Sequence, residues 1–151
     1  MSNLPLAYVC GPFTAKTPHG IAQNIRTAAE LRDALVSKGY AVICPHTMYG
    51  LECVGKEPDE VYMAICLELV RRCDLVAVTS MGALNTSDGS AKEVALTLSL
   101  RIPVYRWGTD VIPTAEAFTA NRPDHLGLFH DKIHRDAGKA KPAKVAKGST
   151  K

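Results

Sequence analysis

Apolar residues occur in two alternating patterns along the chain. Short apolar runs, typical of buried β-strands, occupy residues 6–10, 40–44, 74–78 and 102–105. Longer segments between them, most with an apolar residue every three or four positions, are typical of helices and occupy residues 21–38, 59–72 and 91–101. Apolar strands that alternate with helices predict a parallel sheet covered on both faces. We therefore expect an α/β, Rossmann- or flavodoxin-like sheet of four or five strands.

Glycine and proline residues mark where several of these elements end. Gly39 is placed to stop the first helix, and Pro45 ends the second strand. Pro103 lies in the fourth strand segment, so it should sit at the beginning or edge of that strand, because proline has no N–H for the ladder. The segments 46–58 and 81–87 lack a clear period and are expected to be loops.

The second helix has two features that can be compared with a structure. Asp59 is expected to be its N-cap. Its inward face is expected to consist of Val61, Ile65, Leu69 and Val70. A further helix is expected at 113–120, and the pattern weakens after Asn121.

Composition and charge favour one globular domain with a tail. The chain has 151 residues, of which 46% are hydrophobic, which suits a single domain at residues 1–136. Residues 137–151 are rich in Lys, Ala, Pro and Gly and are expected to be disordered. Five lysines lie in this tail, so the net charge of +3 becomes −2 for the domain alone. A nearly neutral domain makes a nucleic-acid partner unlikely.

The sequence does not predict a membrane segment or a metal site. No apolar run approaches the roughly 18 residues of a membrane helix, and residues 1–5 lack the basic and apolar regions of a secretion signal. A cytoplasmic location is therefore expected. The five cysteines are odd in number and form no C-x-x-C pair, so we expect neither disulfides nor zinc.

The candidate chemistry lies between the third strand and the third helix. A small polar loop at 87–90 joins them, an arrangement that points backbone N–H groups at an anion. Glu93, one turn further, would lie beside the bound group. Gly11 and the loop after Pro45 follow other strands, and ligands of such folds bind at the carboxyl ends of the strands. The alternative is structural: Ser90 and Glu93 have the spacing of a helix capping box.

Six short motifs, in this order and spacing, resemble the nucleoside 2-deoxyribosyltransferase-like superfamily over residues 6–106. They are Tyr8-Val9-Cys10-Gly11, Asn24 within a helix, Gly39-Tyr40 with Pro45-His46, Cys73-Asp74-Leu75, Ser87-x-Gly89-x-x-x-Glu93 and Ile102-Pro103-Val104. The chain is most similar to the small phage and bacterial members and to the 2′-deoxynucleoside 5′-phosphate N-hydrolases.

The resemblance implies a catalytic carboxylate. In that superfamily a Glu attacks the anomeric carbon of a deoxyribosyl group and the base leaves; that residue corresponds to Glu93, and the Tyr that steadies it corresponds to Tyr8. Asp74 is the third predicted catalytic residue. Alternatively, it holds a loop by hydrogen bonds. An acidic residue of many relatives, which protonates the leaving base, is replaced by Cys66, so the acid is unassigned; His46 and a water are the candidates.

The resemblance also implies a set of substrate-binding residues. Ser87 and Gly89 correspond to residues that bind a 5′-phosphate, where a Ser can donate a hydrogen bond and an Asp would repel. The adjacent Asp88 leaves an unphosphorylated nucleoside open. The remaining predicted contacts are Gly11, His46 and Phe13, which could stack on a base or cover the core.

The leading hypothesis is cleavage of the N-glycosidic bond of a 2′-deoxynucleoside 5′-monophosphate, by hydrolysis or by transfer to another base, with no cofactor or metal. One alternative is a ribonucleotide phosphoribohydrolase, although its Gly-Gly-Gly-Thr-rich signature is missing. Another is a non-catalytic nucleotide sensor, which Cys66 favours. The expected partners are a small nucleotide or nucleoside and further copies of the chain, through the second helix or residues 115–122.

Overall fold

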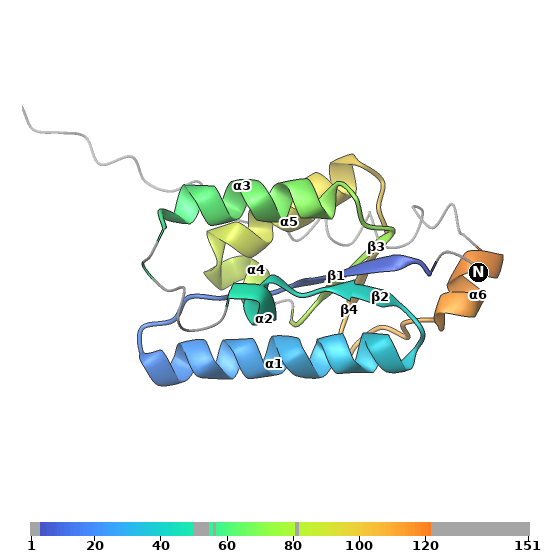
Figure 1. The fold of residues 1–151 in the computed structure, drawn as a ribbon, viewed down its shortest axis with the longest axis horizontal. Helices are drawn as coiled ribbons and strands as arrows, with labels where there is room; N and C mark the ends of the chain where they lie inside the picture. Colours follow the sequence, from blue (N-terminus) through green and yellow to red (C-terminus); the bar gives the residue numbers. More distant parts are fainter. Residues whose placement is uncertain (1–3, 50–54, 56, 81, 122–151) are drawn as a thin grey trace, which may run out of the picture.

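The computed structural model describes residues 4–49, 55, 57–80 and 82–121, and the statements below concern these residues. Four strands form one parallel sheet in the order β2-β1-β3-β4 (Figure 1). Their bounds are β1 Leu6–Cys10, β2 Ala41–Ile43, β3 Leu75–Val78 and β4 Val104–Arg106. In the register, Tyr8 of β1 lies opposite Ile43 on one side and Val76 on the other.

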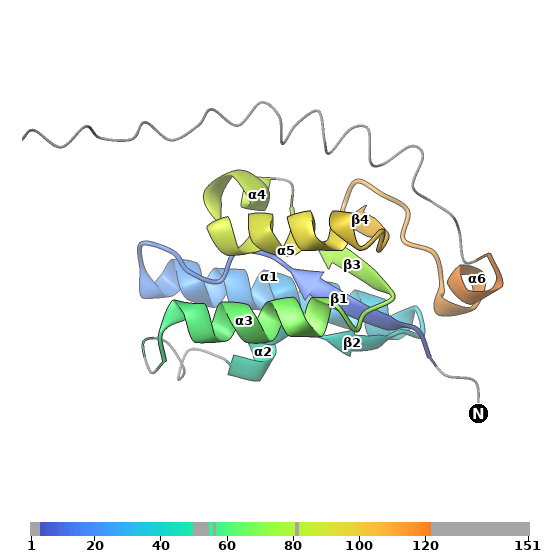
Figure 2. The same ribbon diagram turned by 90° about the horizontal axis from the view of Figure 1, so that it is seen from above.

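Helices cover both faces of this sheet. The long helix α1 (Pro18–Ser37) lies on one face, and α3 (Asp59–Val70) and α5 (Asp88–Ser99) lie side by side on the other (Figures 1 and 2). The short helix α6 (Ala115–Ala120) lies near the amino ends of the strands. The arrangement confirms the predicted α/β, Rossmann- or flavodoxin-like fold.

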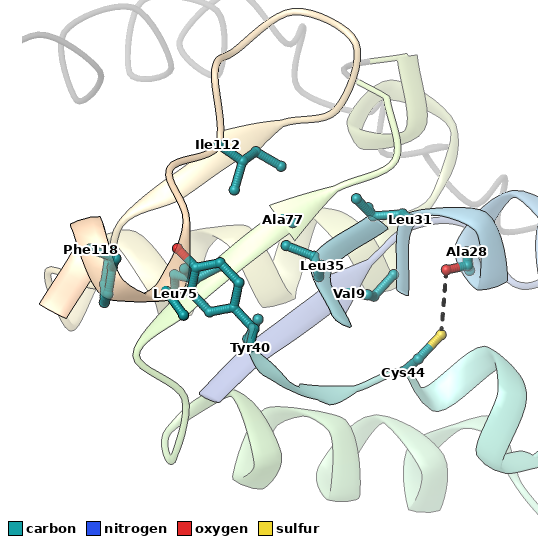
Figure 3. Packing of buried hydrophobic residues seen from close by; sticks show 12 residues of the cluster. Val9, Ala28, Leu31, Leu35, Tyr40, Cys44, Leu75, Ala77, Ile112 and Phe118 are labelled. Carbon is teal, nitrogen blue, oxygen red and sulfur yellow. Dashed lines mark hydrogen bonds between the residues drawn. The ribbon is translucent and has the colours of Figure 1, made fainter. Parts of the chain in front are cut away.

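The core between the sheet and α1 is closed and apolar. Val9 of β1 packs there with Leu31 and Leu35 of α1, all of them fully buried (Figure 3). Tyr40 and Phe118 close the end of this layer, with ring centroids 6.0 Å apart. The Tyr40 hydroxyl donates a hydrogen bond of 3.1 Å to the carbonyl of Pro113, so α6 and its preceding loop are tied to the domain.

Helix α1 begins three residues before its predicted start, for a local reason. Thr17 is its N-cap, and the side-chain oxygen accepts a hydrogen bond of 3.1 Å from the Gly20 N–H. Pro18 takes the first helical position, where its missing N–H costs nothing. The predicted end is confirmed: Gly39 has a φ of +91°, a conformation that side chains with a Cβ rarely adopt.

The predictions for α3 were wrong in two respects. Its N-cap is Pro58, which makes no side-chain hydrogen bond, and Asp59 is the first helical residue. Val61 and Ile65 point outward and are 42% and 38% exposed, whereas Cys66 and Val70 are the buried residues of the helix. The inner and outer sides of α3 are both apolar, so the sequence pattern did not distinguish them.

Two short helices lie in segments that were predicted as loops. Helix α2 (Pro45–Tyr49) begins at Pro45, which thus ends the strand segment and also starts a helix. Helix α4 (Gly82–Thr86) occupies the predicted connection before α5. The predicted position of Pro103 is confirmed, because it directly precedes the edge strand β4.

Several other expectations concern residues outside the described part of the chain. The tail at 137–151 is among them, as is the limit of the domain at residue 136. Cys53 also lies outside it, while the four described cysteines, at positions 10, 44, 66 and 73, are buried and free. No helix in the described part is both long and apolar enough to cross a membrane.

Candidate functional site

The sheet order β2-β1-β3-β4 places a topological switch point between β1 and β3. The connection from β1 to β2 runs through α1 on one face, and the connection from β2 to β3 runs through α3 on the other. Successive strands are therefore added on opposite sides of β1, and the strand order reverses between β1 and β3. Open α/β sheets bind ligands at the carboxyl ends of the strands at such a position. The loops meet closely there: a Cβ on Gly11 would lie 2.5 Å from the Thr79 hydroxyl oxygen, so only glycine fits without rearrangement.

On the α3/α5 side of β1, a buried carboxylate and a buried phenol form a hydrogen-bonded pair. Glu93 lies in the second turn of α5 and is only 7% exposed. The hydroxyl of Tyr8, a fully buried residue of β1, donates a hydrogen bond of 2.8 Å to Glu93 Oε1. Alternation along β1 explains the pair, since Tyr8 and Cys10 face the α3/α5 side of the sheet.

Two thiols complete the surroundings of Glu93. Burial raises the pKa of Glu93, while hydrogen bonds from Cys10, Tyr8 and Cys66 oppose that rise. The thiol of Cys10 also donates to the Ser90 carbonyl at 3.8 Å. Burial raises the pKa of Cys66 to about 11, so this thiol is a weak acid. The carboxylate thus lies among neutral donors, an arrangement suited to a nucleophile or a base.

The capping-box alternative for Glu93 is wrong. Helix α5 begins at Asp88, three residues before its predicted start, and its N-cap is Ser87. Ser87 Oγ accepts hydrogen bonds from the Ser90 N–H at 3.3 Å and from the Ser90 hydroxyl at 3.2 Å. Glu93 lies beyond the first turn and bonds to Tyr8 instead.

The other loop residues lie on the first turn of α5. Asp88 is exposed, and Gly89 lies where α3 passes close by: a Cβ there would be 2.8 Å from Cε of Met63. The structure therefore brings Ser87, Gly89 and Glu93 onto the first two turns of one helix. The first N–H groups of a helix have no acceptor within the helix, so a helix N-terminus can hold an anion; in α5 the Ser90 N–H is already bonded to Ser87 Oγ.

His46 is a buried residue of α2, 4% exposed. Its Nε2 lies 3.1 Å from the carbonyl oxygens of both Gly11 and Pro12. The ring of Phe13 lies close by, with a centroid distance of 5.8 Å. Burial lowers the pKa of His46. The structure therefore groups His46 and Phe13 with Gly11 at the end of β1.

Asp74 does not join this group. It precedes β3 at the amino-terminal edge of the sheet, where its Oδ2 accepts a hydrogen bond of 2.8 Å from the Leu6 N–H. The candidate site lies at the opposite, carboxyl-terminal edge. The geometry does not bring Asp74 together with Tyr8 and Glu93, and the hydrogen bond to Leu6 favours its alternative role of holding backbone.

Sequence reasoning did not identify Cys10 as a neighbour of Glu93. The signal was present, because Cys10 follows Tyr8 by two positions and must share its face of the strand. Within the described ranges, no group of three or more His, Cys, Asp or Glu side chains could hold a metal ion. A pocket of about 240 Å³ lies elsewhere, between α1 and the segment 107–112, and contains none of the predicted site residues.

Comparison with known proteins places this site within a recognised domain. A family model described as a domain of unknown function, DUF7768, matches residues 5–107. The chain belongs to the DUF7768 family. No curated protein matches the chain. The DUF7768 domain spans all four strands and includes both Tyr8 and Glu93, whereas α6 lies outside the match.

Proposed function

We propose that this DUF7768 protein cleaves the N-glycosidic bond of a 2′-deoxynucleoside 5′-monophosphate, with Glu93 as the nucleophile. The observation that carries the proposal is the buried hydrogen bond of 2.8 Å between Tyr8 and Glu93, beside the N-terminus of α5. Glycosidic cleavage passes through an oxocarbenium-like transition state, which a carboxylate at close range stabilises.

The reaction requires a carboxylate of fixed orientation. A Glu93 oxygen forms a bond to the anomeric carbon as the bond from that carbon to the base nitrogen breaks. The base leaves with the electron pair and takes a proton from water or another acid. Water, or a second base, then attacks the anomeric carbon and releases Glu93. Tyr8 holds Oε1 throughout and so limits rotation of the carboxylate.

The N-terminus of α5 would hold the 5′-phosphate. Ser87 Oγ accepts two hydrogen bonds from Ser90, so its own hydroxyl hydrogen can donate to a phosphate oxygen. Gly89 adds a first-turn N–H with no side chain in the way. The positive end of the helix dipole adds to the attraction.

A non-catalytic nucleotide sensor is the second candidate. The observation that favours it is Cys66, whose thiol lies near Glu93 and has a pKa of about 11. Such a thiol is a poor acid for a leaving base at neutral pH. A sensor would bind the same nucleotides through the α5 N-terminus and release no base.

We also propose that the protein is cytoplasmic and that it self-associates. The outer side of α3 supports self-association. Val61 and Ile65 are exposed one turn apart, with acidic residues in the first turn. Arg71 and Arg72 follow the last turn, where both also pair with Glu68. If two copies pack these helices antiparallel about a two-fold axis, the acidic end of each meets the basic end of the other. A homodimer is therefore the form that we propose.

One assay tests the proposed function. Pure protein is incubated with each of the four common deoxynucleoside monophosphates and with the matching nucleosides, and free base is measured by chromatography. We expect base from at least one monophosphate, and far less from its nucleoside. Glu93→Gln should reduce the rate by a factor on the order of 10³ or more.

The control variant is Glu30→Gln, the same chemical change on the exposed side of α1, which should leave the rate unchanged. Binding of monophosphates without any release of base would favour the sensor. If Glu93→Gln retained the wild-type rate, Glu93 could not be the nucleophile.

A further inference from the structure

Among the described residues, only one of the two ring nitrogens of His46 has hydrogen-bond partners. Nε2 lies 3.1 Å from two backbone carbonyls, those of Gly11 and Pro12, and carbonyls only accept hydrogen bonds. Nε2 must therefore carry the proton. In a neutral imidazole the other nitrogen is then an acceptor. Nδ1 is buried and has no hydrogen-bond partner among the described residues.

An unpaired buried acceptor of this kind is uncommon, since buried polar side-chain atoms nearly always have a partner. Leaving one unpaired costs free energy, because the atom has lost its hydrogen bonds to water. The ring is itself held in place by the two carbonyls, so it cannot turn Nδ1 elsewhere without losing them. The missing partner must be a donor.

His46 lies beside the candidate active site, so a bound ligand could supply this donor. Helix α2 begins directly after β2, so His46 lies at the carboxyl edge of the sheet. It contacts the loop that follows β1, one residue beyond Cys10, whose thiol bonds to Glu93. Phe13 beside it offers a flat apolar surface. The unpaired nitrogen thus lies in the same loop cluster as the candidate active site.

We propose that His46 is a specificity-determining residue, whose Nδ1 accepts a hydrogen bond from an N–H or O–H of the bound nucleotide. The inference rests on the proposed function for the identity of the ligand. The donor is either an amino or imino group of the base or a hydroxyl of the sugar. The same geometry rejects His46 as the acid for the leaving base, because Nδ1 holds no proton and burial lowers the pKa of the ring.

Two substitutions separate the roles of the two nitrogens. In His46→Gln the amide nitrogen can reach the place of Nε2 and keep the bonds to Gly11 and Pro12, but nothing replaces Nδ1. In His46→Asn the amide group lies near the place of Nδ1, and the bonds to the two carbonyls are lost. Both variants are made in the Glu93→Gln background, which should bind nucleotides without turning them over.

The measurement is titration calorimetry with deoxyguanosine, deoxyadenosine, deoxycytidine and thymidine monophosphates. For the tightest of them we expect His46→Gln to weaken binding about tenfold, the loss of one hydrogen bond. His46→Asn should weaken it less. Analogues then identify the donor: one lacks the 3′-hydroxyl, another lacks the amino group of the base, and a third carries a methyl group on the imino nitrogen. The analogue without the donor should bind equally well to His46→Gln and to its parent.

A second measurement does not depend on a variant that folds. In protein labelled with ¹⁵N-histidine, the resonance of an unprotonated Nδ1 should move upfield when a saturating monophosphate donates a hydrogen bond to it. An unmoved resonance, or an equal loss of affinity for every analogue, would overturn the role of His46. If the wild-type protein releases base but His46→Gln binds the monophosphates as tightly as its Glu93→Gln parent, this inference alone is overturned. Nucleotide binding without base release would overturn the proposed reaction alone, and no binding at all would overturn both.

Discussion

The two faces of the sheet bury different kinds of side chain, although β1 contributes residues to both. On the α1 face, Ala7 and Val9 of β1 pack among aliphatic and aromatic side chains (Figure 3). On the α3/α5 face, Tyr8 and Cys10 of the same strand surround a carboxylate, Glu93. Strand alternation alone separates a closed apolar layer from a layer that contains a buried carboxylate.

The two faces differ in how their buried side chains affect stability. Apolar burial on the α1 face stabilises the fold. On the opposite face, burial disfavours the charged form of Glu93 and raises its pKa. An ionisable group kept in such a place reduces stability at neutral pH and is retained for another reason, which we propose is catalysis.

Leu31→Ala should produce the largest loss of stability. Leu31 is fully buried in the apolar layer, and removing its side chain leaves a cavity that costs about 2–5 kcal/mol. Chemical denaturation measures the loss. Base release, measured well below the melting temperature, should stay at the wild-type rate. A parallel loss of activity and stability would show that the two faces are not independent.

Glu93→Gln should have the opposite signature, with lost activity and a changed pH dependence of stability. Because burial raises the pKa of Glu93 in the folded state, the folded protein holds that proton more tightly than the unfolded chain does. Wild-type stability should therefore fall as the pH rises from about 4.5, the ordinary value for Glu, to the raised pKa, and stay lower above it.

Denaturation of both proteins at pH 4 and at pH 8 tests this sign. The variant should gain stability relative to the wild type as the pH rises, because Gln has no proton to lose. The rate of base release should fall as the solution becomes more acidic, because protonated Glu93 is not a nucleophile. A constant difference in stability across this range would contradict the raised pKa.

The sequence predicted the strands better than it predicted the site. Continuous apolar runs are specific for buried parallel strands, and β1 was predicted with its observed bounds of Leu6–Cys10. The short helices α2 and α4 were missed because five-residue helices are too short to show a period. Two of the three predicted catalytic residues, Tyr8 and Glu93, lie together.

Asp74 could have been placed correctly from its position in the sequence. It comes directly before a strand, so it must lie at the amino-terminal edge, whereas ligands of this fold bind at the opposite edge. The unpaired Nδ1 of His46 could not have been predicted, because it depends on how the loops after two strands meet. The outward side of α3 was missed because Val61 and Ile65 continue an apolar pattern that also covers the inner side.

The smallest expected effect on stability concerns that outer side of α3, where Ile65→Lys tests self-association. Ile65 is 38% exposed, so a lysine there should change the stability of one copy little. In the proposed dimer the same residue lies between the two copies, and two buried lysines would repel each other. Light scattering should show a change of mass from dimer to monomer, while Val36→Lys, an exposed position on α1, should leave the dimer intact. A wild-type protein that is already monomeric would remove the reason that we give for the exposed side chains of α3.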